Sequence, residues 1–376
     1  MPGMTGVGRY TYNLLAALAA LPEGPRIRAL FLRESIDRAR SDAALGGVEL
    51  IEAPVSRESH PRGDLWLERT LPRWMRPGEV YHNSAFLLPG GRQPFGRVVT
   101  IHDLFVFTHP RCFRFRFRAW LRWNTRRACR WADRIIVPSR TIADQLVGLG
   151  LAPAEKVRSI HEAPDATPPI WEQDENETHD LPGVSEANKD APLLLTVATL
   201  EPRKDPGTVR RACIELQEKL PGGNASFRWM WVGGSGTVPD DSPEDLRLAA
   251  RRAGFLEAGP RSRQTLNQAY NRATALVTCS RAEGFGIPLV EAMAHGCPII
   301  ASDISIHREV AGDAALYFPL ENSHALADRL ERLIADRELR QSLSSRGLAR
   351  SKAFSWRRAA EQTLAVYEEC PRDQGG

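Results

Sequence analysis

The sequence contains no apolar run approaching the ~20 residues that a transmembrane helix needs. Its six cysteines form no C-x-x-C pair and show no metal-ligand spacing, so we expect buried thiols in a reducing compartment. The net charge is only +4, which is too small to indicate nucleic-acid binding. These absences argue against a membrane-spanning chain, a disulfide-stapled fold and a structural zinc domain.

The opening stretch, MPGMTGVGRYTYNLL, lacks the basic start, the apolar core and the small-residue cleavage site of a signal peptide. We therefore expect a cytoplasmic protein. A peripheral position on the inner face of the membrane stays open, because one segment of the chain is rich in arginine and aromatic residues.

That segment runs from Arg111 to Arg134 and holds nine arginines, three phenylalanines, three tryptophans and one acid, Asp133. Cations interleaved with aromatic rings suit an anionic membrane surface. They also suit an amphipathic surface helix whose rings face the core, and we leave these two interpretations open. Stacking on single-stranded nucleic acid is a third interpretation, which we do not favour.

The chain has 376 residues, a length that fits two domains. Short apolar runs alternate with helical patterns in both halves, which predicts α/β domains with parallel sheets. We expect an N-terminal domain over 1–165, an acidic, proline-rich linker over 166–190 and a C-terminal domain over 191–354. A last helix within 355–376 is expected to pack back toward the N-terminal domain. Open parallel sheets bind ligands at the carboxyl ends of their strands, so a site in the cleft between the domains is predicted.

The stretch AEGFGIPLVEAMAHGCPIIASD, residues 282–303, places two glutamates around a glycine turn. A strand precedes the turn and a helix follows it, so free amides at the helix start would bind phosphate. Glu291, one turn into the helix, is placed to accept two hydrogen bonds from a ribose diol. Glu283, before the helix, is placed to hold sugar hydroxyls. A nucleotide sugar is therefore the predicted ligand, with further contacts from the turn residues Gly284, Phe285, Gly286 and Ile287.

This stretch resembles the retaining glycosyltransferases of family 4, which have the GT-B fold of two Rossmann-like domains facing a cleft. The resemblance extends through ASDISIHREVAGDAALYFP (301–319), VATLEPRKDPGTV (197–209), TGVGRYTYNLLAAL and TIHDL. It implies that Arg203 and Lys204 neutralise the leaving diphosphate and that His102 lies near the reacting sugar. Asp103 is more suited to orient its own loop, although we count it among the substrate-binding residues. Gly6 and Gly8 would form a glycine loop near the diphosphate and acceptor.

The resemblance implies transfer of a hexose from a nucleotide diphosphate sugar to a glycan or lipid-linked acceptor, with attack from the front face. No D-x-D triplet occurs, so a carboxylate metal site is not signalled and we expect no metal and no other cofactor. The motifs are most similar to the bacterial mannosyltransferases, which makes GDP-mannose the expected donor. A phosphorylase or epimerase of the same fold is a weaker alternative. A non-catalytic membrane- or partner-binding protein on a degenerate scaffold is the alternative from another class.

Members of this family begin with an apolar strand before the glycine loop. The sequence reaches Gly6 after MPGMT, which holds no apolar run. We therefore expect the first strand of the N-terminal domain to be missing from the middle of its sheet. A segment from elsewhere in the chain would be the alternative occupant of that position.

Overall fold

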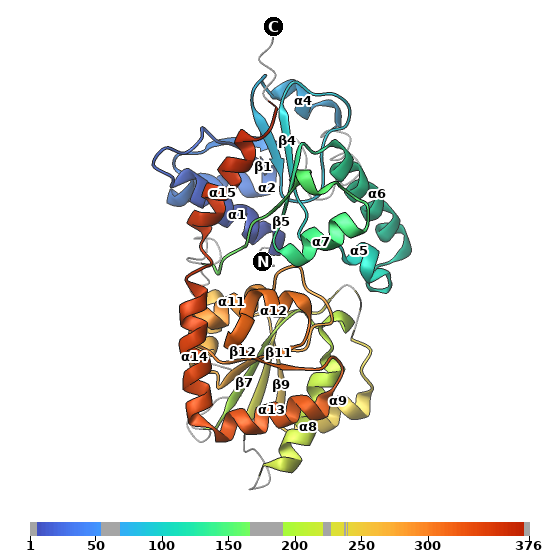
Figure 1. Cartoon of the computed structure of the whole chain (residues 1–376), viewed down its shortest axis with the longest axis vertical. Coiled ribbons are helices and arrows are strands. Elements are labelled where there is room, and N and C mark those ends of the chain that lie inside the picture. The colour runs from blue at the N-terminus through green and yellow to red at the C-terminus, as the bar shows by residue number, and fades with distance from the viewer. Residues whose placement is uncertain are drawn as a thin grey trace. The chain divides into compact units, whose positions relative to one another are not determined.

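The computed structural model describes residues 6–53, 68–165, 191–220, 227–236, 238 and 240–371. The chain divides into two compact units. Unit 1 consists of Met1–Trp171 together with Ser355–Gly376, and unit 2 is Glu172–Phe354. Each unit has helices packed around parallel strands, as Figure 1 shows. The expected linker over 166–190 lies outside the described residues.

Unit 1 contains two parallel sheets, one of two strands and one of four. The strands are β1 (Arg28–Leu32), β2 (Glu49–Ala53), β3 (Val80–Asn83), β4 (Gly96–Thr100), β5 (Arg134–Val137) and β6 (Val157–Ser159). The helices are α1 (Gly6–Ala19), α2 (Arg33–Arg40), α4 (Leu71–Trp74), α5 (Phe105–Thr108), α6 (Phe115–Trp131), α7 (Arg140–Gly148) and α15 (Trp356–Glu368). Short apolar runs of the N-terminal half thus form strands, among them β4, β5 and β6.

The two sheets of unit 1 are separate. β1 pairs with β2, and the second sheet has the order β3-β4-β5-β6. No strand within the described residues joins them. Arg28, at the start of β1, donates to Glu79 just before β3 over 3.0 Å, so a side-chain ion pair connects two segments that share no strand pairing.

Helix α15 belongs to unit 1, although it follows unit 2 in the chain. It lies beside α1, which is visible in Figure 1 as red against blue. Its residues Ala359 and Val366, and Cys370 just beyond its end, pack with Val98 of β4 and Ile136 of β5. The hydrophobic core of unit 1 is therefore built from both ends of the chain.

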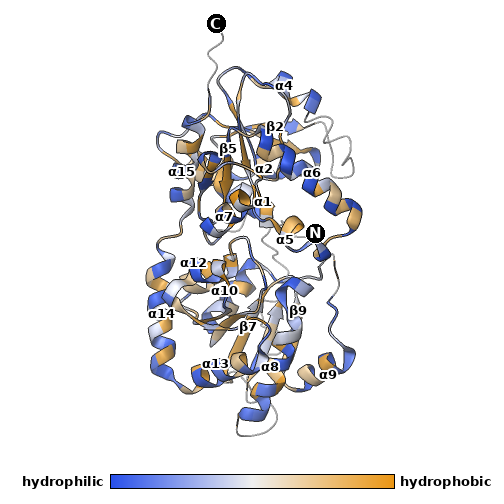
Figure 2. Cartoon of the chain, turned by 45° about the vertical axis from the view of Figure 1, so that its right-hand side comes forward, coloured by the Kyte–Doolittle hydropathy of each residue, from blue (hydrophilic) through white to orange (hydrophobic). Residues whose placement is uncertain are grey.

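Unit 2 has one six-stranded parallel sheet of order β12-β11-β10-β7-β8-β9. The strands are β7 (Leu193–Val197), β8 (Arg228–Val232), β9 (Phe255–Gly259), β10 (Ala275–Thr278), β11 (Ile299–Ser302) and β12 (Ala315–Phe318). The helices are α8 (Pro206–Lys219), α9 (Glu244–Arg252), α10 (Arg263–Arg272), α11 (Ile287–Ala294), α12 (Ser305–Ala311), α13 (Ser323–Ala335) and α14 (Arg337–Ser351). The strands are almost wholly apolar, because both faces of the sheet are covered. Figure 2 colours β7 accordingly as hydrophobic.

The strand order of unit 2 reverses direction between β7 and β10. From β7 the chain proceeds to β8 and β9 on one side, and from β10 it proceeds to β11 and β12 on the other. The loops that leave β7 and β10 therefore diverge at the carboxyl edge of the sheet, which is where open parallel sheets hold their ligands.

Every helix among the described residues is too short or too polar to span a bilayer.

Candidate active site

The loops after β7 and β10 carry the residues that the sequence singled out. Arg203 and Lys204 lie in a short 3-10 turn, Pro202–Lys204, that leads into α8. Glu283 lies in the loop between β10 and α11. The backbone N–H of Arg281 donates to the carbonyl of Arg203 over 2.9 Å, which ties the two loops together. The topological switch point thus brings three predicted residues into one place.

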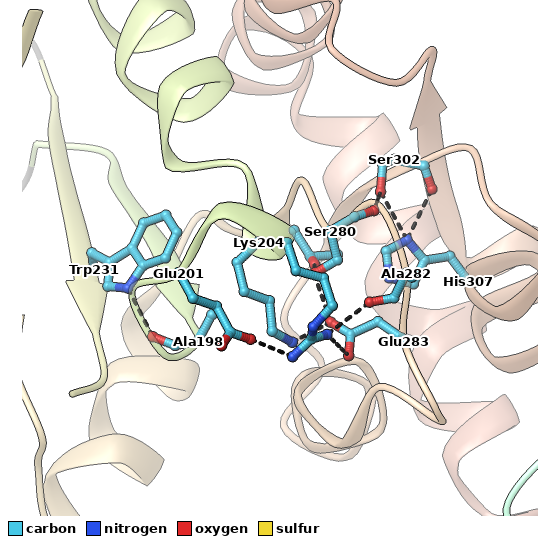
Figure 3. Close-up of polar contacts among 11 residues, drawn as sticks. Ala198, Glu201, Lys204, Trp231, Ser280, Ala282, Glu283, Ser302 and His307 are labelled. Atoms are coloured by element: carbon cyan, nitrogen blue, oxygen red, sulfur yellow. Dashed lines mark hydrogen bonds and ion pairs between the residues drawn. The ribbon is translucent and has the colours of Figure 1, made fainter. Parts of the chain in front are cut away.

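Glu283 is the centre of a partly buried ion cluster (Figure 3). Lys204 Nζ donates to its Oε1, and Arg203 Nη1 approaches its Oε2 at 3.4 Å. The hydroxyl of Ser280 donates to Oε1 over 2.6 Å. Arg203 also donates to Glu201, which precedes the turn. The side chains of Arg203, Lys204 and Glu283 are 12–14% exposed, so the charges interact with little screening by water.

Two cations and two carboxylates thus balance one another in this cluster. Burial raises the pKa of Glu283, but the charges of Lys204 and Arg203 outweigh it and lower that pKa to about 2. Burial also lowers the pKa of Lys204, and Arg203 adds to this shift, while Glu283 opposes it. Glu283 is therefore ionised at neutral pH, and carboxylates hold both Arg203 and Lys204 in place.

The pH dependence of stability should report the ionised state of Glu283. Because its folded pKa lies below the ordinary 4.5, its contribution is present above about pH 4.5 and is lost as the pH falls toward 2. In urea unfolding of unit 2, we expect the free energy of unfolding to fall by up to about 3 kcal/mol across that range, because Glu283 becomes protonated. The variant Glu283→Gln should show a flatter profile. The exposed Glu244, replaced by glutamine as a control, should leave the wild-type slope; equal slopes in all three proteins would contradict the assignment.

The glycine turn has the predicted form. Gly286 adopts φ +93° as the N-cap of α11, where a side chain is strained, and Pro288 occupies the first turn. The helix ends before Gly296, which has φ +63°. The side chain of Phe285 is buried and packs edge-to-face on Phe354 at 5.8 Å. The Phe285 side chain is therefore a core residue, and its predicted contact with substrate stays a prediction. The contacts predicted for Gly284, Gly286 and Ile287 likewise stay predictions.

Glu291 lies inside α11 and is 5% exposed. Its Oε1 accepts from Arg263 Nη1 at 2.5 Å, and its Oε2 accepts from the Tyr270 hydroxyl at 2.8 Å. Both donors come from α10, seven residues apart and therefore on one face of that helix. A carboxylate has about four acceptor positions, so both oxygens keep acceptor capacity beyond these two hydrogen bonds. Arg263 and Tyr270 were not predicted as site residues, because their only signal in the sequence is their helical spacing.

His102 lies at the carboxyl end of β4 in unit 1. Its Nδ1 is 3.1 Å from Glu162 Oε1 and its Nε2 is 3.0 Å from the carbonyl of Ser84. A carboxylate and a carbonyl accept hydrogen bonds, so this pair of partners favours the protonated ring, in which both nitrogens donate. Burial lowers its pKa, but the hydrogen bond and charge of Glu162, with the charge of Asp103, outweigh burial and raise it. Both ring nitrogens therefore have partners within the protein, and Glu162 is a third residue, after Arg263 and Tyr270, that was not predicted from the sequence.

Of the other predicted residues of unit 1, Asp103 lies as expected, whereas Gly6 and Gly8 do not. Asp103 is exposed, and its Oδ1 accepts from the N–H of Phe105 over 3.0 Å, which orients the loop as anticipated. Gly6 and Gly8 lie in the first turn of α1 and not in a loop before it, which corrects the predicted glycine loop. The ring of Tyr10 from the same helix contacts His102 edge-to-face at 4.6 Å. Packing against the sheet thus extends α1 through two poor helix formers.

The predicted polar residues of unit 2 thus lie in two separate clusters of side chains. Arg203, Lys204 and Glu283 form one cluster in unit 2, and Glu291 lies with Arg263 and Tyr270 in the same unit. Gly6, Gly8, His102 and Asp103 belong to unit 1. No group of three or more His, Cys, Asp or Glu side chains within the described residues is arranged to hold a metal ion.

Comparison with known proteins gives matches across both units. Residues 4–166 match the profile described as Glycosyltransferase Family 4, and residues 178–350 match Glycosyl transferases group 1. O-antigen chain mannosyltransferase B of Escherichia coli is 24% identical, with 97% of this chain and 96% of the relative aligned. A D-inositol 3-phosphate glycosyltransferase of Actinosynnema mirum is 30% identical over 63% of this chain and 57% of that protein.

Among solved structures, Anabaena Alr3699/HepE in complex with UDP and glucose aligns with a TM-score of 0.65. The alignment covers 97% of this chain and 96% of that one at 15% identity, so it shows the fold alone. Matching profiles on both units, together with the two parallel-sheet units of this fold, identify the chain as a member of the family 4 glycosyltransferases with the GT-B fold.

Proposed function

We propose that the protein is a retaining, metal-independent hexosyltransferase that moves mannose from GDP-mannose to a glycan or lipid-linked acceptor in polysaccharide or glycolipid assembly. The observation that carries the proposal is the convergence of Arg203 and Lys204 on Glu283 at the switch point of the unit 2 sheet. The name of the Escherichia coli relative supports mannose as the sugar.

The cations have a defined task in this reaction. Breaking the bond between sugar and diphosphate leaves negative charge on the leaving group, and fixed cations stabilise charge that develops in the transition state. Arg203 and Lys204 are positioned before the donor arrives, because Glu201, Glu283 and the carbonyl of Ala282 hold them. Glu283 would then accept hydrogen bonds from sugar hydroxyls and Glu291 from the ribose. The acceptor would attack from the face that the diphosphate leaves, with a phosphate oxygen taking its proton.

A screen of nucleotide sugars tests this proposal. Purified protein is incubated with GDP-mannose, UDP-glucose and UDP-N-acetylglucosamine. Binding of each donor is measured by titration, and its slow hydrolysis is measured by the release of nucleotide. We expect GDP-mannose to be bound and consumed, and we expect EDTA to leave the rate nearly unchanged. Preference for another sugar would replace mannose in the proposal, and strict dependence on a divalent ion would overturn the metal-free mechanism. Failure to bind any of the donors would favour the alternative, a non-catalytic protein on this scaffold.

The second part of the proposal is that helix α6 binds an anionic membrane surface. Its buried residues are Asn124, Thr125, Ala128 and Cys129, all in the C-terminal half of the helix. Phe115, Phe117 and Trp123 are 73%, 50% and 60% exposed, so these rings do not face the core. Arg118 lies over the ring of Phe115, and Figure 2 shows polar and apolar residues mixed along α6. Exposed rings beside arginines are the composition that binds at lipid headgroups.

Vesicle binding should reveal this surface. We expect the protein to sediment with phosphatidylglycerol vesicles at low salt and to be released as salt rises, because the charges become screened. The double variant Phe115→Ser/Phe117→Ser should bind at least about tenfold more weakly, since two exposed rings are lost. Leu248→Ser, at an exposed leucine of unit 2, serves as the matched control. Binding that is absent, or that ignores both salt and the double variant, would restore the interpretation as a plain surface helix.

A further inference from the structure

His307 is a buried histidine beside the ion cluster that the proposed chemistry leaves unassigned. It lies in α12, the helix that follows β11, and is 1% exposed. A chain of hydrogen bonds connects its neighbourhood to the cluster. The Ser302 hydroxyl donates to the carbonyl of Ser280 over 2.6 Å, and the Ser280 hydroxyl donates to Glu283. Figure 3 shows the His307 ring between Ser302 and the turn of Ala282 and Glu283.

The contacts of the ring fix its tautomer. Nδ1 lies 2.9 Å from the carbonyl oxygen of Ser302, which only accepts, so Nδ1 carries the hydrogen. The Ser302 hydroxyl, 3.2 Å from Nδ1, gives its own hydrogen to Ser280 and is not a donor to the ring. In the neutral ring, Nε2 therefore presents a lone pair. Burial lowers the pKa of His307, and Lys204 lowers it further while Glu283 opposes, so the neutral form is favoured.

Nε2 is the part of this residue that calls for a ligand. It is buried, and no side chain or backbone group among the described residues donates to it. Buried polar atoms of native proteins are nearly always hydrogen-bonded, so an acceptor left over beside a binding site marks a position that a ligand can complete. The ring belongs to the surroundings of Glu283, the carboxylate assigned to sugar hydroxyls, because the charge of Glu283 acts on the pKa of His307.

We propose that His307 Nε2 accepts a hydrogen bond from one hydroxyl of the donor hexose and, with Glu283, selects the sugar that is transferred. The inference rests on the proposed function, because it needs a nucleotide sugar bound at this cluster. A hexose that lacks this hydroxyl, or carries it in the opposite configuration, leaves Nε2 without a donor and is rejected for that reason. His307 is thus a specificity-determining residue that acts through an acceptor and not through charge.

The test combines a variant with deoxygenated donors. His307→Asn keeps an N–H close to the position of Nδ1 and removes Nε2. The full-length wild type and this variant are assayed with GDP-mannose and with its 2-, 3-, 4- and 6-deoxy analogues. We expect the wild-type kcat/KM to fall about tenfold for one analogue in particular. The variant should start about tenfold lower and should lose no more than about twofold for that same analogue, because the partner of the hydroxyl is already gone.

Controls separate this role from a structural one. A merely structural His307 would lower every rate by one factor and keep the wild-type ranking of the analogues, which would overturn the inference. His324→Asn, at a histidine 72% exposed on α13, should match wild type with every donor. His307→Gln provides a second variant if the asparagine variant melts much lower. If the wild type consumes UDP-glucose instead, the deoxy series of that donor is used. If it binds no nucleotide sugar, the proposed function itself fails.

Discussion

Replacing Lys204 with alanine should lower the rate of sugar transfer by about two to three orders of magnitude, the loss typical of removing one preorganised group that stabilises developing charge. Binding of the nucleotide should change far less, because the charge on the leaving group grows only in the transition state. The melting temperature should fall by less than about 5 °C, since Arg203 and Ser280 still hold the carboxylate of Glu283. Single-turnover rates, binding constants and melting curves together check this result.

Lys219→Ala is the matched control for Lys204. Lys219 ends α8 in ion pairs with Asp328 and Glu331, so its loss should leave catalysis untouched. Lys204→Arg keeps the charge and should recover part of the rate. A fall in stability large enough to account for the lost activity, or a rate that is unchanged, would show that Lys204 only holds the fold.

Replacing Glu291 with alanine should weaken the binding of GDP about ten- to a hundredfold, because hydrogen bonds from ribose hydroxyls to a carboxylate are charge-assisted. It should also destabilise unit 2 by about 3–5 kcal/mol, since Arg263, 6% exposed, loses its carboxylate partner. Isothermal titration with GDP and urea unfolding measure the two effects separately.

Tyr270→Phe distinguishes the two roles of Glu291. It removes the hydroxyl that donates to Oε2 and leaves the carboxylate in place, so stability should fall while GDP affinity changes less than about threefold. If Tyr270→Phe and Glu291→Ala weaken GDP binding equally, Glu291 acts by shaping α10 and α11 and does not touch the ribose.

The sequence predicted the parts of the site that depend on local pattern. Arg203, Lys204 and Glu283 each follow an apolar run, and a residue after a parallel strand lies at the ligand-binding edge of its sheet. The three residues touch because β7 and β10 are neighbours in the sheet. Strand order decides this, and the local sequence pattern contains no information about strand order. Glycine, proline and a following helix were enough to predict the turn at Gly286.

The contacts between distant segments could not be predicted from the sequence. Glu291 is held by two residues of another helix, and His102 by Glu162, sixty residues away. Such pairings arise only when the sheet has brought two loops together, and a lone glutamate gives no signal of its partner. The start of α1 at Gly6 was missed because glycine has low intrinsic helix propensity, whereas packing of Tyr10 in the core decides the outcome.

The position of α15 sets the order in which the protein is completed during synthesis. Tyr367 bonds to His82 Nδ1 over 2.7 Å, and His82 and Tyr10 both bond to Thr100, so the first-made unit is joined through its interior to the last-made helix. At roughly 5–20 residues per second, translation of unit 2 takes about ten seconds or more. During that time the apolar residues that pack against α15 stay uncovered. The N-terminal unit is therefore begun first and finished last, and a ribosome that stalls within unit 2 would leave Val98 and Ile136 uncovered.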